Sequence, residues 1–125
     1  MATADLSSYK TLYIQTAKEY VNKISVSLDK LSSNVLDKDA LNNLHIASHS
    51  LKSQSQVMGF IDIANICLGI EKRSDEALKG ISQLNSGNIT SIKSLVDQVK
   101  QILNSPKGTS LSGGGAVQND TGAKI

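Results

Sequence analysis

Apolar residues recur at every third or fourth position along most of this chain, a spacing that predicts amphipathic helices. The first predicted helix runs roughly from residue 5 to residue 31, and residues 32–34, with the sequence Ser-Ser-Asn, end it. Its apolar positions form one continuous stripe, which consists of Leu6, Tyr9, Tyr13, Ala17, Tyr20, Ile24, Leu28 and Leu31.

The second predicted helix begins near Asp37 or Asp39, because either carboxylate can cap the free amides of a first turn. It continues to about Met58, and Gly59 then fits the left-handed position that follows a helix end. The apolar face of this helix, with two residues at its edge, consists of Leu41, Leu44, Ala47, Ser48, Leu51, Ser55 and Met58.

The third predicted helix begins near Ile61 or Asp62. Gly80 is its candidate end, since a glycine inside a helix costs about 1 kcal/mol relative to alanine. Ser74 interrupts its apolar stripe, which consists of Ile63, Ile66, Cys67, Ile70, Ala77, Ile81 and Leu84.

The fourth predicted helix follows residues 85–88, with Asn88 or Thr90 as its cap. Pro106 closes it, because proline cannot continue a helix. Its buried face consists of Ile92, Leu95, Val96, Val99, Ile102 and Leu103.

Four amphipathic helices with short connections predict an all-α fold, an antiparallel up-down four-helix bundle over residues 1–105. Aromatic residues make up only 3% of the chain, so aliphatic side chains must fill the core. Residues 106–125 are rich in glycine and polar residues, which predicts a flexible tail or an interdomain linker. The apolar stripes suffice for one core, and we therefore expect a monomer.

Charge and cysteine content exclude several classes of protein. The formal net charge is +2, and no basic stripe is interleaved with aromatic residues, so we expect no nucleic-acid partner. The single cysteine, Cys67, cannot form an internal disulfide, which favours a reducing compartment. No apolar run is long enough to span a membrane, and from residues 1–5 we expect no signal peptide. We therefore expect a cytoplasmic protein with no membrane partner.

The polar face of the second helix carries the candidate chemistry. His45, His49, Lys52 and Gln56 form a stripe, and His49 lies roughly 160° from the centre of the apolar face. Its imidazole should therefore point outward. Lys52 lies within reach of any group attached to that ring, because residues three apart are neighbours on a helix.

The segment from His49 to Phe60 resembles the active-site helix of histidine-containing phosphotransfer domains, most closely the N-terminal domain of the chemotaxis histidine kinase. The resemblance rests on the pattern His-x-x-Lys, small residues, and Gly-Phe at positions 59 and 60. Helix order and lengths extend it over about residues 6–103. One departure is Ser53, which stands where the family usually has glycine and slightly reduces the clearance for a partner.

The third helix adds a second point of resemblance. The chemotaxis-kinase group has a glutamate eleven residues after Gly-Phe that bonds the inner nitrogen of the histidine, and Glu71 occupies that position here. A position three residues earlier, often histidine in that group, is Leu68. The polar network should therefore be smaller than in those relatives.

The resemblance implies a phosphocarrier of two-component signalling. A histidine kinase catalytic domain would transfer the γ-phosphoryl group of ATP to Nε2 of His49, and an aspartate of a response-regulator receiver domain would then take it. Glu71 would orient the ring, and Lys52 would offset phosphoryl charge. The domain needs no cofactor or metal of its own. Candidate docking residues around the histidine are Ile46, Ser50, Ser53, Gln56 and Val57.

Other interpretations remain open at this point. His45 and His49 have the spacing of a helical zinc-binding pair, but no third ligand is evident. A helical adaptor without phosphotransfer is a further alternative. An autonomous enzyme is disfavoured, because the chain has no nucleotide-binding fingerprint. Within the carrier class, the chain is either the first domain of a chemotaxis-type kinase, which Glu71 and residues 58–60 favour, or a free-standing relay protein.

Overall fold

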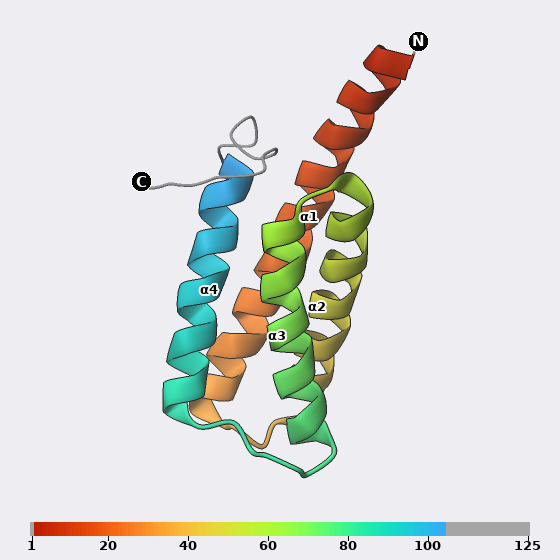
Figure 1. Cartoon of the computed structure of the whole chain (residues 1–125). Helices are drawn as coiled ribbons and strands as arrows, with labels where there is room; N and C mark the ends of the chain where they lie inside the picture. Colours follow the sequence, from red (N-terminus) through yellow and green to blue (C-terminus); the bar gives the residue numbers. More distant parts are fainter. Residues whose placement is uncertain (1, 105–125) are drawn as a thin grey trace.

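The computed structural model describes residues 2–104, which form four helices (Figure 1). They are α1 (Ala2–Ser33), α2 (Lys38–Met58), α3 (Ile61–Leu78) and α4 (Ser86–Asn104). Consecutive helices run in opposite directions, and each of α1 and α3 packs against both α2 and α4 (Figure 1). The prediction of an all-α four-helix bundle is confirmed, whereas the predicted tail lies outside the described residues.

The core is aliphatic and lies along the centre of the bundle. One aromatic contact closes the end beside the α2–α3 turn, where the rings of Tyr13 and Phe60 lie 4.8 Å apart between centroids. The Tyr13 hydroxyl is 2.6 Å from the Ser55 hydroxyl, so this buried polar group is satisfied. The largest fully buried aliphatic side chains come from all four helices and include Ile24, Leu28, Leu44, Leu51, Ile63, Ile70, Ile92 and Leu103.

The turn between α2 and α3 sets how these two helices face each other. Gly59 has φ of 82°, a left-handed conformation that residues with a side chain rarely adopt. The Phe60 amide donates to the Ser55 carbonyl at 2.8 Å, which completes the helix end. At the other end of α2, Asp37 is the cap, and its Oδ1 accepts from the Ala40 amide at 3.0 Å.

The end of α3 agrees with the prediction that Gly80 ends this helix, but the predicted apolar position Ile81 does not belong to it. Helix α3 ends at Leu78 and Gly80 follows with φ of 75°, so Ile81 lies outside the helix and is 70% exposed. Leu84 is buried as expected, but it reaches the core from the connection.

The cap of α4 also differs from the prediction, since the helix begins at Ser86 and Asn85 precedes it. The Asn85 side chain accepts from the Asn88 amide at 2.8 Å, and the Asn88 side chain accepts from the Asn85 amide at 3.1 Å. This reciprocal pair satisfies two amides at the start of the helix at once.

None of the described helices is both long and apolar enough to cross a membrane.

The core predicts a contrast between two leucines. Leu28 is fully buried, whereas Leu36 in the α1–α2 connection is 64% exposed. We expect Leu28→Ala to lower the free energy of unfolding by about 2–5 kcal/mol, through lost burial and the cavity left behind. Leu36→Ala should change it by less than about 0.5 kcal/mol. Urea denaturation measures both values, and equal losses would contradict the assigned core.

Candidate functional site

His49 lies on the surface of α2 opposite its buried face. That buried face includes Leu44, Ala47 and Leu51. The His49 side chain is 56% exposed. The orientation expected from the helical wheel is therefore present, and the imidazole is accessible from solvent.

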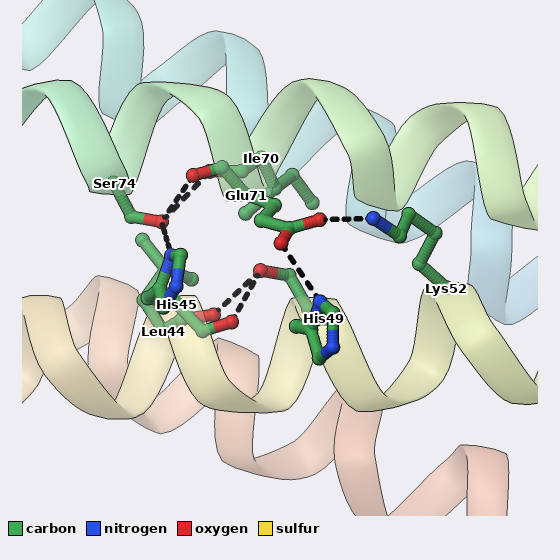
Figure 2. A network of polar contacts seen from close by, with 8 residues as sticks. Leu44, His45, His49, Lys52, Ile70, Glu71 and Ser74 are labelled. Atoms are coloured by element: carbon green, nitrogen blue, oxygen red, sulfur yellow. Dashed lines mark hydrogen bonds and ion pairs between the residues drawn. The ribbon is translucent and has the colours of Figure 1, made fainter.

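Glu71 of α3 bridges two residues of α2 (Figure 2). One carboxylate oxygen lies 2.8 Å from Nδ1 of His49, and the other accepts from Nζ of Lys52 at 2.6 Å. The side chains of Glu71 and Lys52 are only 16% and 18% exposed. Both contacts are charge-assisted, and the Lys52 contact is also partly shielded from water, so together they restrain the carboxylate between the two helices.

The ionisation of Glu71 decides which nitrogen of His49 carries a proton. Partial burial raises the pKa of Glu71, but hydrogen bonds from Lys52 and His49, together with their charges, outweigh it and hold the pKa below its ordinary value of 4.5. An ionised carboxylate can only accept hydrogen bonds, so Nδ1 of His49 must carry the proton. In the neutral ring, Nε2 then holds the free lone pair.

Lys52 lies on the α3 side of His49. Its ammonium bonds Glu71, an ion pair that the sequence did not predict. The Nε2 atom of His49 points away from α3, on the opposite side of the ring from the carboxylate (Figure 2). In this arrangement the direct contact of Lys52 is with the carboxylate that orients the histidine.

Ser74 lies near the site, but the sequence analysis did not identify it as a site residue. There it was interpreted only as an interruption of the apolar stripe of the third helix. The side chain is fully buried, and its hydroxyl lies 2.9 Å from the Glu71 carbonyl and 3.0 Å from the Ile70 carbonyl. Nδ1 of His45 lies 3.5 Å from the same hydroxyl (Figure 2). A serine can sit in a helix core when it bonds a carbonyl of the preceding turn. A serine within the apolar stripe was therefore the feature of the sequence that could have indicated a buried, hydrogen-bonded Ser74.

Comparison with known proteins identifies the family. A profile of the Hpt domain matches residues 8–102, which is more than half of the chain. The chain belongs to the Hpt domain family. It is therefore a phosphotransfer domain, and it is similar in sequence and structure to chemotaxis CheA proteins.

Two relatives and one solved structure resemble this Hpt domain. The chemotaxis protein CheA of Halobacterium salinarum is 22% identical over 104 residues, which are 83% of this chain and 16% of that protein. The CheA of Bacillus subtilis is 23% identical over 101 residues, 81% and 15% of the two proteins. The CheA phosphotransferase domain from Thermotoga maritima matches with a TM-score of 0.76 and 25% identity, covering 81% of this chain and 96% of that domain. The Hpt domain therefore spans about one sixth of the length of the two CheA relatives.

The predicted docking residues lie on the helix that carries the histidine of the Hpt domain. Ile46 is 53% exposed and Val57 is 84% exposed, so both apolar side chains are accessible to a partner. Ser53 and Gln56 are also exposed, while Ser50 is half-buried. All five residues lie on α2. Leu68 of α3 is 41% exposed and adds no polar group to the network, as the sequence indicated.

The zinc alternative gains no support from the geometry. Each histidine of the proposed pair faces its own partner on α3, Ser74 for His45 and Glu71 for His49. Within residues 2–104, no group of three or more His, Cys, Asp or Glu side chains is placed to hold a metal ion.

The bridging carboxylate predicts a pH dependence of stability. Because the folded-state pKa of Glu71 is lowered, Glu71 stabilises the fold above pH 4.5, and this contribution is lost as the pH falls below that value towards the folded-state pKa. Wild-type protein should therefore lose more unfolding free energy than Glu71→Gln between about pH 6 and about pH 3. Urea denaturation across this range measures the difference.

The matched control is Glu76→Gln on the same helix, since Glu76 is exposed and forms no ion pair within the described part of the chain. This variant should follow the wild-type pH dependence. Parallel curves for wild type and Glu71→Gln would mean that the carboxylate contributes nothing measurable.

Proposed function

We propose that this Hpt domain carries a phosphoryl group on Nε2 of His49 between a histidine kinase catalytic domain and a response-regulator receiver domain. The observation that supports this most directly is the 2.8 Å contact from Glu71 to Nδ1. It holds the neutral ring in the tautomer whose free lone pair is on Nε2, and the exposed ring allows a large partner to approach.

The proposed reaction balances without a base that removes a proton. The Nε2 lone pair of His49 attacks the γ-phosphorus of ATP, a P–N bond forms, and the bond to the bridging oxygen breaks with its electron pair leaving on ADP. The ring keeps its proton on Nδ1, and the positive charge it gains is stabilised by Glu71. In the second step an aspartate oxygen attacks phosphorus, and the P–N electron pair returns to Nε2.

The ammonium of Lys52 supports this chemistry in two ways. Lys52 restrains the Glu71 carboxylate through its 2.6 Å contact. The same ammonium is one helical turn from His49, close enough to offset part of the negative charge of a phosphoryl group. Magnesium belongs to the kinase and receiver sites, where phosphates and carboxylates supply its oxygen ligands.

The similarity to two CheA proteins and a CheA phosphotransferase domain favours a chemotaxis-type kinase as the context. In that arrangement the phosphoryl donor is a separate catalytic domain. One alternative is a free-standing relay protein with the same chemistry. Another is an adaptor that carries no phosphoryl group, and a labelling experiment distinguishes the adaptor from both carriers.

The labelling experiment uses the full chain, a chemotaxis-type kinase catalytic domain and radiolabelled ATP. We expect wild type and His45→Gln to take up label, and His49→Gln to fold normally without label, because only His49 has its ring oriented by a carboxylate. Label on His49→Gln would move the site to His45. A wild-type chain that binds its partners but takes no label would support the adaptor.

Removing the orienting charge should slow phosphorylation without preventing it. Glu71→Gln loses a charge-assisted hydrogen bond worth about 1.5–3 kcal/mol, which corresponds to a decrease of roughly ten- to a hundredfold in the rate of labelling. Glu76→Gln serves as the control and should label at the wild-type rate. An unchanged rate for Glu71→Gln would remove the orienting role.

A further inference from the structure

The helical neighbours of His49 differ in what they can offer to a group on Nε2. On a helix surface the neighbours of a residue lie three and four positions away, and here they are His45, Ile46, Lys52 and Ser53. The polar contacts of Lys52 and His45 are with residues of α3. Ile46 has an aliphatic side chain without a hydrogen-bond donor. Ser53 therefore stands apart, because it is exposed and carries a hydroxyl.

The hydroxyl of Ser53 has no hydrogen-bond partner within residues 2–104. Three other helical serines, Ser32, Ser48 and Ser74, donate to carbonyls four residues earlier, at 3.0, 2.8 and 3.0 Å. A serine hydroxyl supplies one donor and rotates to suit its acceptor. The donor of Ser53 is therefore available to a group outside the described helices.

Ser53 lies on the same side of His49 as Nε2. With about 100° per residue, Ser53 falls some 40° from His49, and Lys52 falls some 60° in the opposite direction. Lys52 bonds α3, whereas Nε2 points away from α3 (Figure 2). Because Cα–Cβ bonds tilt towards the N-terminus of a helix, the side chain of Ser53 leans back over the turn that carries His49. A group on Nε2 therefore extends into the region that this hydroxyl covers.

We propose that Ser53 is a phosphoryl-binding residue, whose hydroxyl donates a hydrogen bond to an oxygen of the phosphoryl group carried on Nε2 of His49. This inference rests on the proposed function. The phosphoryl oxygens are negatively charged acceptors, which form stronger hydrogen bonds than neutral ones. The ammonium of Lys52 acts from the other side of the ring, where it bonds Glu71. The hydroxyl of Ser53 supplies a donor on the side that the ammonium does not occupy.

The hydrogen bond prolongs the lifetime of the phosphohistidine in water. In hydrolysis a water oxygen bonds to phosphorus, and the P–N bond breaks with its electron pair returning to Nε2. The products are a neutral ring, which keeps its proton on Nδ1, and dihydrogen phosphate. Because the transition state of phosphoryl transfer is loose, the phosphoryl oxygens carry less charge there than in the phosphohistidine. A donor to these oxygens stabilises the phosphohistidine more than the transition state, and hydrolysis slows.

The test measures hydrolysis of the loaded full chain without any partner protein, so docking cannot contribute. Every protein carries His45→Gln, which leaves His49 as the single histidine of the chain. Phosphoramidate loads the ring, the reagent is removed, and phosphorus NMR follows the conversion of phosphohistidine to inorganic phosphate. Serine at position 53 is compared with Ser53→Ala, and Ser53→Thr with Ser53→Val, so each pair differs in the hydroxyl. The matched control is Ser91→Ala, at an exposed position of α4.

We expect loss of the hydroxyl to accelerate hydrolysis by about two- to tenfold in each pair, the effect of one hydrogen bond of ordinary net strength. Ser91→Ala should hydrolyse at the rate of the protein with Ser53. Before loading, nitrogen NMR should show the same tautomer of His49 in every variant, because Glu71 sets it. Thermal unfolding checks that all variants fold.

The remaining outcomes overturn the proposal. Equal rates within both pairs, or slower hydrolysis without the hydroxyl, would show that Ser53 does not stabilise the phosphoryl group. Acceleration in one pair alone would assign the effect to side-chain volume. The same acceleration in Ser91→Ala would make it unspecific. An altered tautomer in Ser53→Ala would mean that this residue acts through the orientation of the ring.

Failure of the proposed function gives a different result. A chain that phosphoramidate loads, but that a kinase catalytic domain does not label, would defeat the carrier role, while the hydrolysis rates would still decide the contact of Ser53. A chain that takes no phosphoryl group from phosphoramidate would overturn both.

Discussion

The packing of α2 against α3 is the constraint on which the candidate site depends. Leu44 and Leu51 on one helix and Ile63 and Ile70 on the other are fully buried, so neither helix can rotate without exposing apolar surface. The left-handed Gly59 reverses the chain within two residues. Because His49 and Glu71 lie at similar distances from this turn, antiparallel packing places them opposite each other.

Once the helices are fixed, the carboxylate of Glu71 organises the polar groups between them. It satisfies Lys52 and His49 with separate oxygens, at 2.6 and 2.8 Å. Partial burial acts to raise the pKa of Glu71, and the hydrogen bonds and charges of Lys52 and His49 together lower it. The result is a histidine whose inner nitrogen is occupied and whose outer nitrogen is free, which is the state a nucleophilic imidazole requires.

The surroundings of His49 differ between its α3 side and its α1 side. Residues on the α3 side bond one another and set the protonation of the ring. Residues on the α1 side, including Ile46 and Val26, remain exposed next to lysines without carboxylate partners in the described region.

The sequence by itself determined the helices, because the spacing of apolar residues specifies which face of each helix is buried, and it placed His49 on the open face of α2. It also pointed to Glu71 through resemblance. It was wrong about Ile81 and about the cap of α4, since turn geometry and reciprocal Asn85–Asn88 bonds override periodicity there. Only the tertiary structure decided that Lys52 pairs with Glu71, that Ser74 lies buried beside His45, and that Lys23 and Lys30 line a groove between α1 and α2. These features join residues from different helices, and the pattern along one helix carries no information about the rotation and register of its neighbour.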